Sequence, residues 1–445
     1  MRRITALALS LLILLLSSCS FIQPTIEELM KPPKLSQQQM EVDAALKAAL
    51  GTNSIKLKYP LSGDYRSAYV FYDIDSDGVE EAIVFYQPSL DESGTRINIL
   101  DYQEGAWTSV YDVPGEDSAE VDYISFENIV SKDYKNIIIG WQPQNSKDKL
   151  ISIYAYENQE LRGVFDDKYN LSVVQDYNGD GLMDLLLISL RRSTVSLVTR
   201  REDAIRSVDR IDISQDIREV VQVLSGRLAD GRQAVYLDVY LDGANYATEI
   251  IAVEDDALVP LIDISKVYSS VEDEASEEEL LNFERTQRYE RILSQDVNGD
   301  GIIDVPSSAP MLGYEELDES EQMFLTTYSD LRGGVLEPVI QASVNVEAGY
   351  LLRFPDEWLD SVSVVAETEV NQWRYIKFLG TLNDRSSELL RISRVSKNDY
   401  QDRFETDPVS LAQKGIYQYL GYLPLAGDRE LSITRTELQQ MFSLL

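Results

Sequence analysis

The sequence predicts a mainly β protein, a five-bladed β-propeller followed by a small α+β domain. From about residue 55, short runs rich in Val, Ile and Tyr alternate with turns of Gly, Asp and Asn, a pattern typical of strands. One acidic turn motif recurs along this region, with weaker copies between the complete ones. Near residue 345 the repeat stops, and strand patterns are then mixed with helix patterns. We therefore expect the propeller at residues 53–344 and the α+β domain at residues 345–445.

The acidic motif reads D-x-[DN]-x-D-G-x-x-[DE] and occurs three times, at residues 73–81, 176–184 and 296–304. Oxygen-bearing side chains at alternate positions can converge on one point where glycine lets the turn fold back, and Ca2+ prefers six to eight oxygen ligands. In an EF-hand the twelfth position is Glu, but here it is Val84, Leu187 or Ser307. The acid at the ninth position must therefore close each predicted calcium site.

Each loop supplies four side chains and one backbone carbonyl as predicted ligands. These are Asp73, Asp75, Asp77, Glu81 and the carbonyl of Val79 for the first ion; Asp176, Asn178, Asp180, Asp184 and the carbonyl of Leu182 for the second; and Asp296, Asn298, Asp300, Asp304 and the carbonyl of Ile302 for the third. Acidic DG turns also occur as ordinary hairpin turns, but three copies with one closing acid favour metal. We expect three structural ions, since no positioned base marks a catalytic metal.

The spacing of the repeats suits propeller blades. Two weaker copies, at residues 129–139 and 228–236, extend the series of equivalent positions to Glu81, Asn136, Asp184, Gln233 and Asp304. The first three intervals are 55, 48 and 49 residues, close to the roughly 40–50 residues of a four-stranded blade. The last interval is 71 residues and contains an acidic segment, 272–283, with the capping-box pair Ser276 and Glu279. An inserted short helix explains its length.

Within a blade, the acidic loop is expected to join two adjacent strands. In the first blade, residues 97–100 and 107–111 then form a second strand pair. Closure of five blades into a ring would remove the exposed sheet edges that promote aggregation. A β-sandwich that carries the same loops is the main alternative. Pro306 follows the third loop closely, so the strand that leaves this loop is expected to be short or at an edge.

The N-terminus resembles a bacterial lipoprotein signal. Arg2 and Arg3 precede an apolar run at residues 4–16, and the sequence Leu-Ser-Ser-Cys that ends at Cys19 resembles a lipobox. The resemblance implies a signal peptide at residues 1–18, a lipid on Cys19 and a location at the extracytoplasmic face of the bacterial cell membrane. Cys19 is the only cysteine, so no disulfide can form within the chain. The alternative is an ordinary signal peptide with an incidental cysteine.

Residues 19–52 are predicted to be a tether followed by a helix. Prolines favour an extended chain up to about residue 35. Ser36 and Gln39 form a capping-box pair, and Gly51 stands where a C-terminal cap belongs. We expect the apolar positions of this helix to pack on the domain that follows.

Charge and composition exclude several classes of function. The chain carries a formal net charge of −36 and contains no histidine. Loss of residues 1–18 would remove two arginines and change the charge to −38. Such an acidic surface repels nucleic acid and favours cationic partners. The absence of histidine excludes Ser-His-Asp and Cys-His nucleophile systems and histidine-ligated zinc.

The C-terminal domain is predicted to contain both strands and helices. Strands are expected at residues 362–365, 373–378, 389–395 and 417–422. A helix is expected near residues 408–415. A final helix is expected at residues 434–442, with Thr434 as its N-cap and Glu437 as the matching acid.

The loops, set between strands and repeated along the chain, resemble the FG-GAP/VCBS repeats of integrin-type β-propellers. Together with the lipobox, the capped helix and the Phe-Pro-x-x-Trp sequence that ends at Trp358, they resemble FG-GAP/VCBS-repeat lipoproteins of Gram-positive, clostridial-type bacteria. The resemblance implies an architecture and no activity. We expect a monomeric, lipid-anchored cell-surface protein that binds a cell-envelope protein or glycan without catalysis. The alternative is a carboxylate-type glycoside hydrolase, for which no short motif marks the acid pair.

Overall fold

The computed structural model describes most of the chain after the predicted tether. The described residues are 35–88, 94–116, 118–243, 245–268, 275–368, 374–382, 385–396, 408–424 and 430–445. Cys19 and the predicted signal peptide lie outside this range, so the predicted lipid anchor stays a prediction. Among the described residues, no helix is both long enough and apolar enough to cross a membrane.

Antiparallel sheets dominate the fold and follow one another in chain order. The first sheet contains β1 (Lys56–Leu57), β2 (Tyr69–Tyr72), β3 (Glu81–Gln87), β4 (Arg96–Gln103) and β5 (Ala106–Pro114). The second contains β6 (Ala119–Glu127), β7 (Asn136–Pro143), β8 (Lys149–Glu157) and β9 (Glu160–Tyr169). The third contains β10 (Leu171–Gln175), β11 (Asp184–Ser189), β12 (Thr194–Arg201) and β13 (Ala204–Asp212). The mainly β prediction and the strand pair at residues 97–100 and 107–111 are confirmed.

Two further sheets complete the series of repeats. The fourth contains β14 (Ile217–Arg227), β15 (Gln233–Leu241), β16 (Tyr246–Glu254) and β17 (Ala257–Ile262). The fifth contains β18 (Val305–Pro310), β19 (Phe324–Arg332), β20 (Val335–Asn345), β21 (Tyr350–Arg353) and β27 (Phe442–Leu444). The helices α4 (Ser265–Tyr268) and α5 (Glu277–Glu284) lie between these sheets in sequence, and Ser276 and Glu279 form the predicted capping box. The strand β18, which contains Pro306, is an edge strand as predicted.

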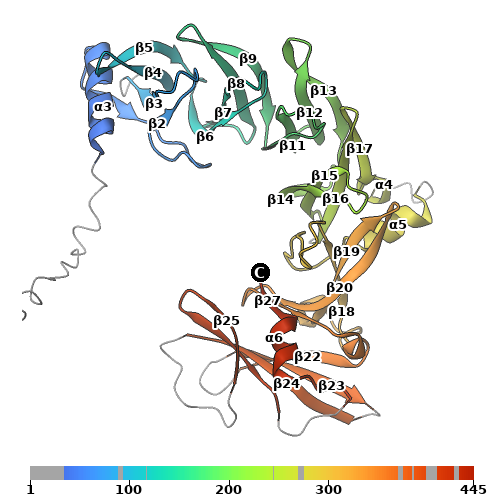
Figure 1. Ribbon diagram of the computed structural model, residues 1–445. Helices are drawn as coiled ribbons and strands as arrows, with labels where there is room; N and C mark the ends of the chain where they lie inside the picture. The colour runs from blue at the N-terminus through green and yellow to red at the C-terminus, as the bar shows by residue number, and fades with distance from the viewer. Residues whose placement is uncertain are drawn as a thin grey trace, which may run out of the picture.

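The sheets stack face to face along an open curve rather than in a closed ring (Figure 1). Alternate residues of a strand point to opposite faces, so a sheet in the middle of the stack buries both faces. In β3, for example, Ile83 and Phe85 pack toward the second sheet, whereas Ala82 and Val84 pack on the opposite face. Each successive pair of sheets shares an apolar core in this way. The prediction of a closed ring is therefore not confirmed.

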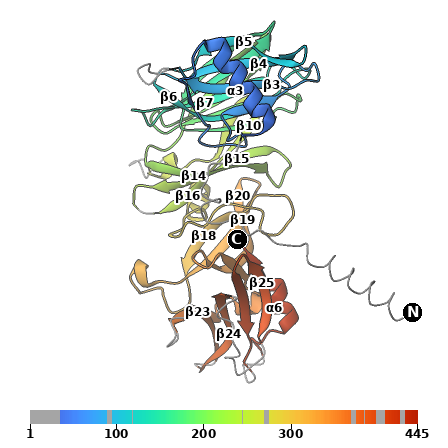
Figure 2. The same ribbon diagram turned by 90° about the vertical axis from the view of Figure 1, so that its left-hand side faces the viewer.

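The helix α3 (Gln37–Leu50) gives a physical reason for the open arrangement. It begins after Ser36, whose capping box with Gln39 is formed as predicted, and it ends at Gly51, which has a φ of 65°. Val42 and Leu46 are fully buried against the outer face of the first sheet. Figure 2 shows α3 lying across this sheet. In a ring the last blade would cover that face, but here the helix removes it from water.

The C-terminal region covers the other end of the stack. Its sheet has the order β22 (Val362–Thr368), β23 (Arg374–Leu382), β24 (Arg385–Ser396), β26 (Tyr417–Tyr422) and β25 (Val409–Lys414). The helix α6 (Arg435–Met441) has the predicted capping box of Thr434 and Glu437. One core joins this sheet to β21 and β27, so the chain returns to the fifth sheet at its end.

One predicted helix is wrong. Residues 408–415 were expected to be helical, but β25 is a strand that pairs with β26. Gly415, with a φ of 61°, lies in the tight turn between Lys414 and Tyr417, which are paired across the hairpin. A glycine with positive φ can end a helix or turn a hairpin, and the local sequence did not distinguish the two.

Candidate metal sites

The three acidic loops occupy equivalent places in three of the sheets. The first joins β2 to β3, and the second joins β10 to β11. The third is closed by an isolated bridge between Gln295 and Asp304, and β18 begins directly after it. In each loop the glycine after the third ligand position has a positive φ, which a side chain would strain: Gly78, Gly181 and Gly301 have φ values of 91°, 82° and 83°.

The same hydrogen bonds shape all three loops. The carboxylate at the first position accepts from the glycine N–H over 2.9–3.0 Å, as in Asp73 with Gly78. The side-chain oxygen at the third position accepts from the N–H of the fifth, as in Asn178 with Asp180. The carboxylate at the fifth position accepts from the N–H of the seventh, whose residues are Val79, Leu182 and Ile302. Oxygen-bearing side chains are thereby turned into the loop.

The closing acid is the most informative group of each loop. One of its oxygens accepts from the N–H of the second loop residue over 2.8–2.9 Å in all three sites. Its other oxygen has no hydrogen-bond partner, although Glu81 and Asp184 are only 1% exposed and Asp304 is 0% exposed. A buried carboxylate oxygen without a partner is costly unless a cation neutralises it. The three unsatisfied oxygens therefore fit a metal ion.

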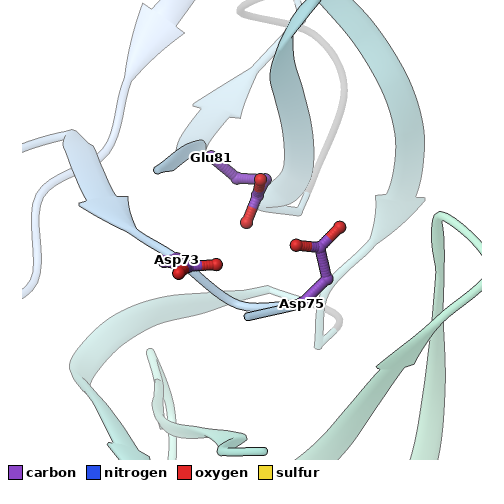
Figure 3. A group of neighbouring side chains, drawn as sticks. All are labelled: Asp73, Asp75 and Glu81. Carbon is purple, nitrogen blue, oxygen red and sulfur yellow. The ribbon is translucent and has the colours of Figure 1, made fainter. Parts of the chain in front are cut away.

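The first loop brings three predicted ligands together. Carboxylate oxygens of Asp73, Asp75 and Glu81 lie within 4.8 Å of one another. Figure 3 shows these side chains directed toward a common space from β3 and from the turn that precedes it. The donor set consists of oxygens alone, which suits a hard cation such as Ca2+.

Crowding and burial of the carboxylates also affect their protonation. Burial, with repulsion from Asp75 and Asp101, raises the pKa of Glu81 to about 7. Burial and the neighbouring Asp330 raise the pKa of Asp304 to about 8. Burial likewise raises the pKa of Asp184. These shifts are the expected result when acids are buried close to one another.

The second sheet closes its loop without a metal. At the closing position Asn136 accepts from the N–H groups of Ile129 and Val130, at 3.3 and 2.9 Å. Eight residues earlier, the amide of Asn128 donates to the carbonyl of Tyr134 over 2.9 Å. That carbonyl is at the seventh position, where a complete loop would offer it to the ion. The sequence marked Asn136 as equivalent but missed Asn128, which counting back from Asn136 would have found.

A basic side chain replaces another ligand of the second sheet. Lys132 stands at the fifth position, where the complete loops have Asp77, Asp180 or Asp300. Its ammonium packs against Gly181 of the second acidic loop, in the neighbouring third sheet. The contact is so close that a Cβ added to Gly181 would lie only 2.6 Å from the nitrogen. A positive charge at a ligand position opposes binding of a cation.

The fourth sheet has a shortened turn in place of the loop. Arg227 and Gln233 are already paired across β14 and β15, and the Gly231 N–H bonds to the carbonyl of Leu228 over 2.9 Å. Asp230 accepts from the backbone N–H of Arg232 over 3.0 Å and forms a salt bridge with its side chain. This turn is satisfied by its own residues, as expected for a copy without ligands.

The loops also lie where neighbouring sheets meet. The backbone N–H of Met183 in the second acidic loop bonds to the carbonyl of Asn128 in the preceding sheet over 2.7 Å. Ile302 of the third acidic loop forms a parallel bridge with Arg227 of the fourth sheet. A change in the shape of either loop would therefore alter its contact with the preceding sheet.

Comparisons with known proteins do not identify a family. No family model and no curated protein matches the chain. A candidate 6-phosphogluconolactonase from Bacteroides uniformis shares 10% identity over 75% of this chain and 94% of its own, with a TM-score of 0.30. The exotype rhamnogalacturonan lyase YesX shares 10% identity over 72% of this chain and 61% of its own, with a TM-score of 0.28. Likeness at this level gives no basis for transferring an activity.

Proposed function

We propose that this protein is a lipid-anchored, extracytoplasmic binding module whose stacked sheets are held in place by three structural Ca2+ ions. The observation that carries the proposal is the buried, unpartnered oxygen of the closing acid, which recurs in all three complete loops. The two incomplete copies satisfy the equivalent position with an amide or a tight turn. Binding of a cation would convert three unfavourable sites into favourable ones, so that binding energy stabilises the fold.

The five sheets are proposed to be repeats of the FG-GAP/VCBS type, that is, blades of a five-bladed propeller whose ring is open. Support comes from the position of the loop, which precedes the corresponding strand in each sheet (β3, β7, β11, β15 and β18). In this proposal the metal loops fix the angle between neighbouring sheets. Three ions would offset six of the chain's negative charges, so the protein would remain strongly acidic.

The proposed anchor is a lipid on Cys19, which would keep the stack at the outer face of the cell membrane. Replacement of the thiol in Cys19→Ala prevents acylation, so the protein should be released into the medium or remain as an uncut precursor. Labelled fatty acid should appear on the wild-type chain and be absent from the variant. Failure to label the wild-type chain would refute the anchor.

The proposed ligand is a cell-envelope protein or glycan, bound without catalysis. The test uses the metal-loaded chain on a solid support, incubated with solubilised cell envelope in Ca2+ or in a chelator. We expect specific retention of an envelope component in Ca2+ and weaker retention in chelator. The competing function, a carboxylate-type glycoside hydrolase, predicts instead that envelope glycans acquire new reducing ends in the presence of the chain. No retention together with glycan cleavage would replace the binding proposal with the enzymatic one.

A further inference from the structure

We propose that each metal site receives a further oxygen from the neighbouring strand, and that Asp330 is a direct ligand of the third ion. The inference rests on the proposed calcium sites and adds a residue that lies outside the loop motif. A ligand from the neighbouring strand would explain why the residue opposite the closing acid also differs between complete and incomplete loops.

The register of the sheets identifies the residue that faces each closing acid. Extending the β3–β4 pairing by one residue places Asp101 opposite Glu81. The same step places Thr199 opposite Asp184 and Asp330 opposite Asp304. Directly opposite residues share one face of an antiparallel pair and have close Cβ atoms. All three complete loops thus face an oxygen-bearing side chain.

The incomplete copies lack this feature. The residue opposite Asn136 is Ala155, and the residue opposite Gln233 is Val253. Neither can contribute a side-chain oxygen to a metal. An oxygen-bearing side chain therefore stands opposite the closing position in the three sheets with a complete loop and in neither of the two sheets without one.

Asp330 gives the strongest evidence for an added ligand, because it is 0% exposed and its Oδ1 has no hydrogen-bond partner. Its Oδ2 accepts from the Arg332 guanidinium over 2.6 Å, which fixes the carboxylate on β19. Asp330 lies directly opposite Asp304 in the register of β18 and β19. Two buried carboxylate oxygens without partners thus lie together beside the third loop, where a bound cation would satisfy both.

The composition of the third loop gives Asp330 a further role. The residue at the third position of this loop is Asn298, whereas the first loop has Asp75 there, so the third loop offers one negative charge fewer. Asp330 restores the number of carboxylates at the third site, while its other oxygen is paired with Arg332. The second loop also has an Asn, Asn178, but faces only the neutral Thr199. Because carboxylate number tunes calcium affinity, the second site should be the weakest of the three.

The experiment measures Ca2+ binding to the purified chain by titration calorimetry, with Asp330→Asn as the test variant. Glu219→Gln is the matched control, since Glu219 is an exposed acid near the start of β14, at the end of that strand away from the turns, and its loss changes the net charge equally. Asp101→Asn is a second test variant at a half-exposed position, where folding is not at stake. Terbium luminescence adds a second readout, because a tyrosine that can sensitise a bound ion lies near each site: Tyr156 near Glu81, Tyr177 near Asp184, and Tyr236 near Asp304 and Asp330.

We expect three ions on the wild-type chain, a loss of affinity of roughly tenfold or more at one site in Asp330→Asn, and no change in Glu219→Gln. The tyrosine-sensitised terbium signal of the third site should weaken in parallel, and Asp101→Asn should weaken a different site. Wild-type affinity at all three sites in Asp330→Asn would overturn the inference. No uptake of Ca2+ by the wild-type chain would overturn the proposed function and this inference together.

Discussion

At the scale of residues, the difference between complete and incomplete loops gives a direct test. Asp180→Ala removes a central ligand, whereas Asp230→Ala removes one side of an exposed salt bridge with Arg232. We expect the first change to abolish one calcium site and lower the melting temperature in Ca2+ by several degrees. The second should leave the number of ions unchanged and alter stability little. Equal loss of calcium from both variants would show that the repeats are misaligned.

A second residue-scale prediction concerns Glu249, which is buried on β16 away from the loops. Its Oε2 has no partner, and burial, with repulsion from Asp263, raises its pKa to about 8. The unfolded chain releases this proton near the ordinary value of 4.5, so folding stability falls as the pH rises from about 4.5 to about 8. Glu249→Gln, which cannot ionise, should gain about 3 kcal/mol over wild type between pH 6 and pH 9.

Chemical denaturation at several pH values measures this difference in the free energy of unfolding. Glu254→Gln, a half-buried position at the end of the same strand whose carboxylate is paired with Arg232, is the control and should show no such dependence. If the free energy of unfolding changed with pH in the same way for Glu249→Gln and wild type, the raised pKa of Glu249 would be contradicted.

The sequence was sufficient for the loop residues but not for their surroundings. Alternating oxygens and a glycine within nine positions specify a metal loop locally, and the shared hydrogen-bond network agrees with that interpretation. Asp330 could not be found in this way, because its relation to Asp304 depends on strand register. The role of Asn128 likewise depends on the folded loop, because only there does its amide donate to the carbonyl of Tyr134.

At the scale of elements, α3 is predicted to stabilise the first sheet by covering its outer face. Leu46→Ala leaves a cavity against that sheet, and such changes typically cost roughly 2–5 kcal/mol. Met40→Ala, at a position that is 54% exposed on the same helix, should have an effect within about 0.5 kcal/mol. Denaturant titration of both variants measures the difference, and equal effects would mean that the helix does not protect the sheet.

Capping signals predicted the helices well, because a cap depends on neighbouring residues. Ser36, Ser276 and Thr434 all form the expected capping boxes. The strand β25 stands where a helix is predicted, and Gly415 in its hairpin turn has a positive φ, a backbone requirement that a helix cap shares. Only pairing with β26, a tertiary contact, decides between the two.

At the scale of the whole molecule, the stack should be longer than a compact particle of the same mass. A compact domain of about 430 residues has a radius of gyration of roughly 22 Å. An open curve of sheets with ends covered by α3 and the C-terminal sheet should exceed this value in small-angle scattering (Figure 1). A value near that of a compact particle would instead favour a closed ring. The repeat spacing could not distinguish these arrangements, because both use the same sheets.

Calcium should stiffen this stack, since the loops contact neighbouring sheets through Met183 and Ile302. The most direct test of the account is the metal content of the purified wild-type chain after equilibration with millimolar Ca2+ and removal of free ion, determined by elemental analysis. We predict three ions per chain, falling to two in a variant in which Asp184, the closing acid of the second loop, is changed to Asn. A chain that retains no calcium, or a content that Asp184→Asn leaves unchanged, would contradict it.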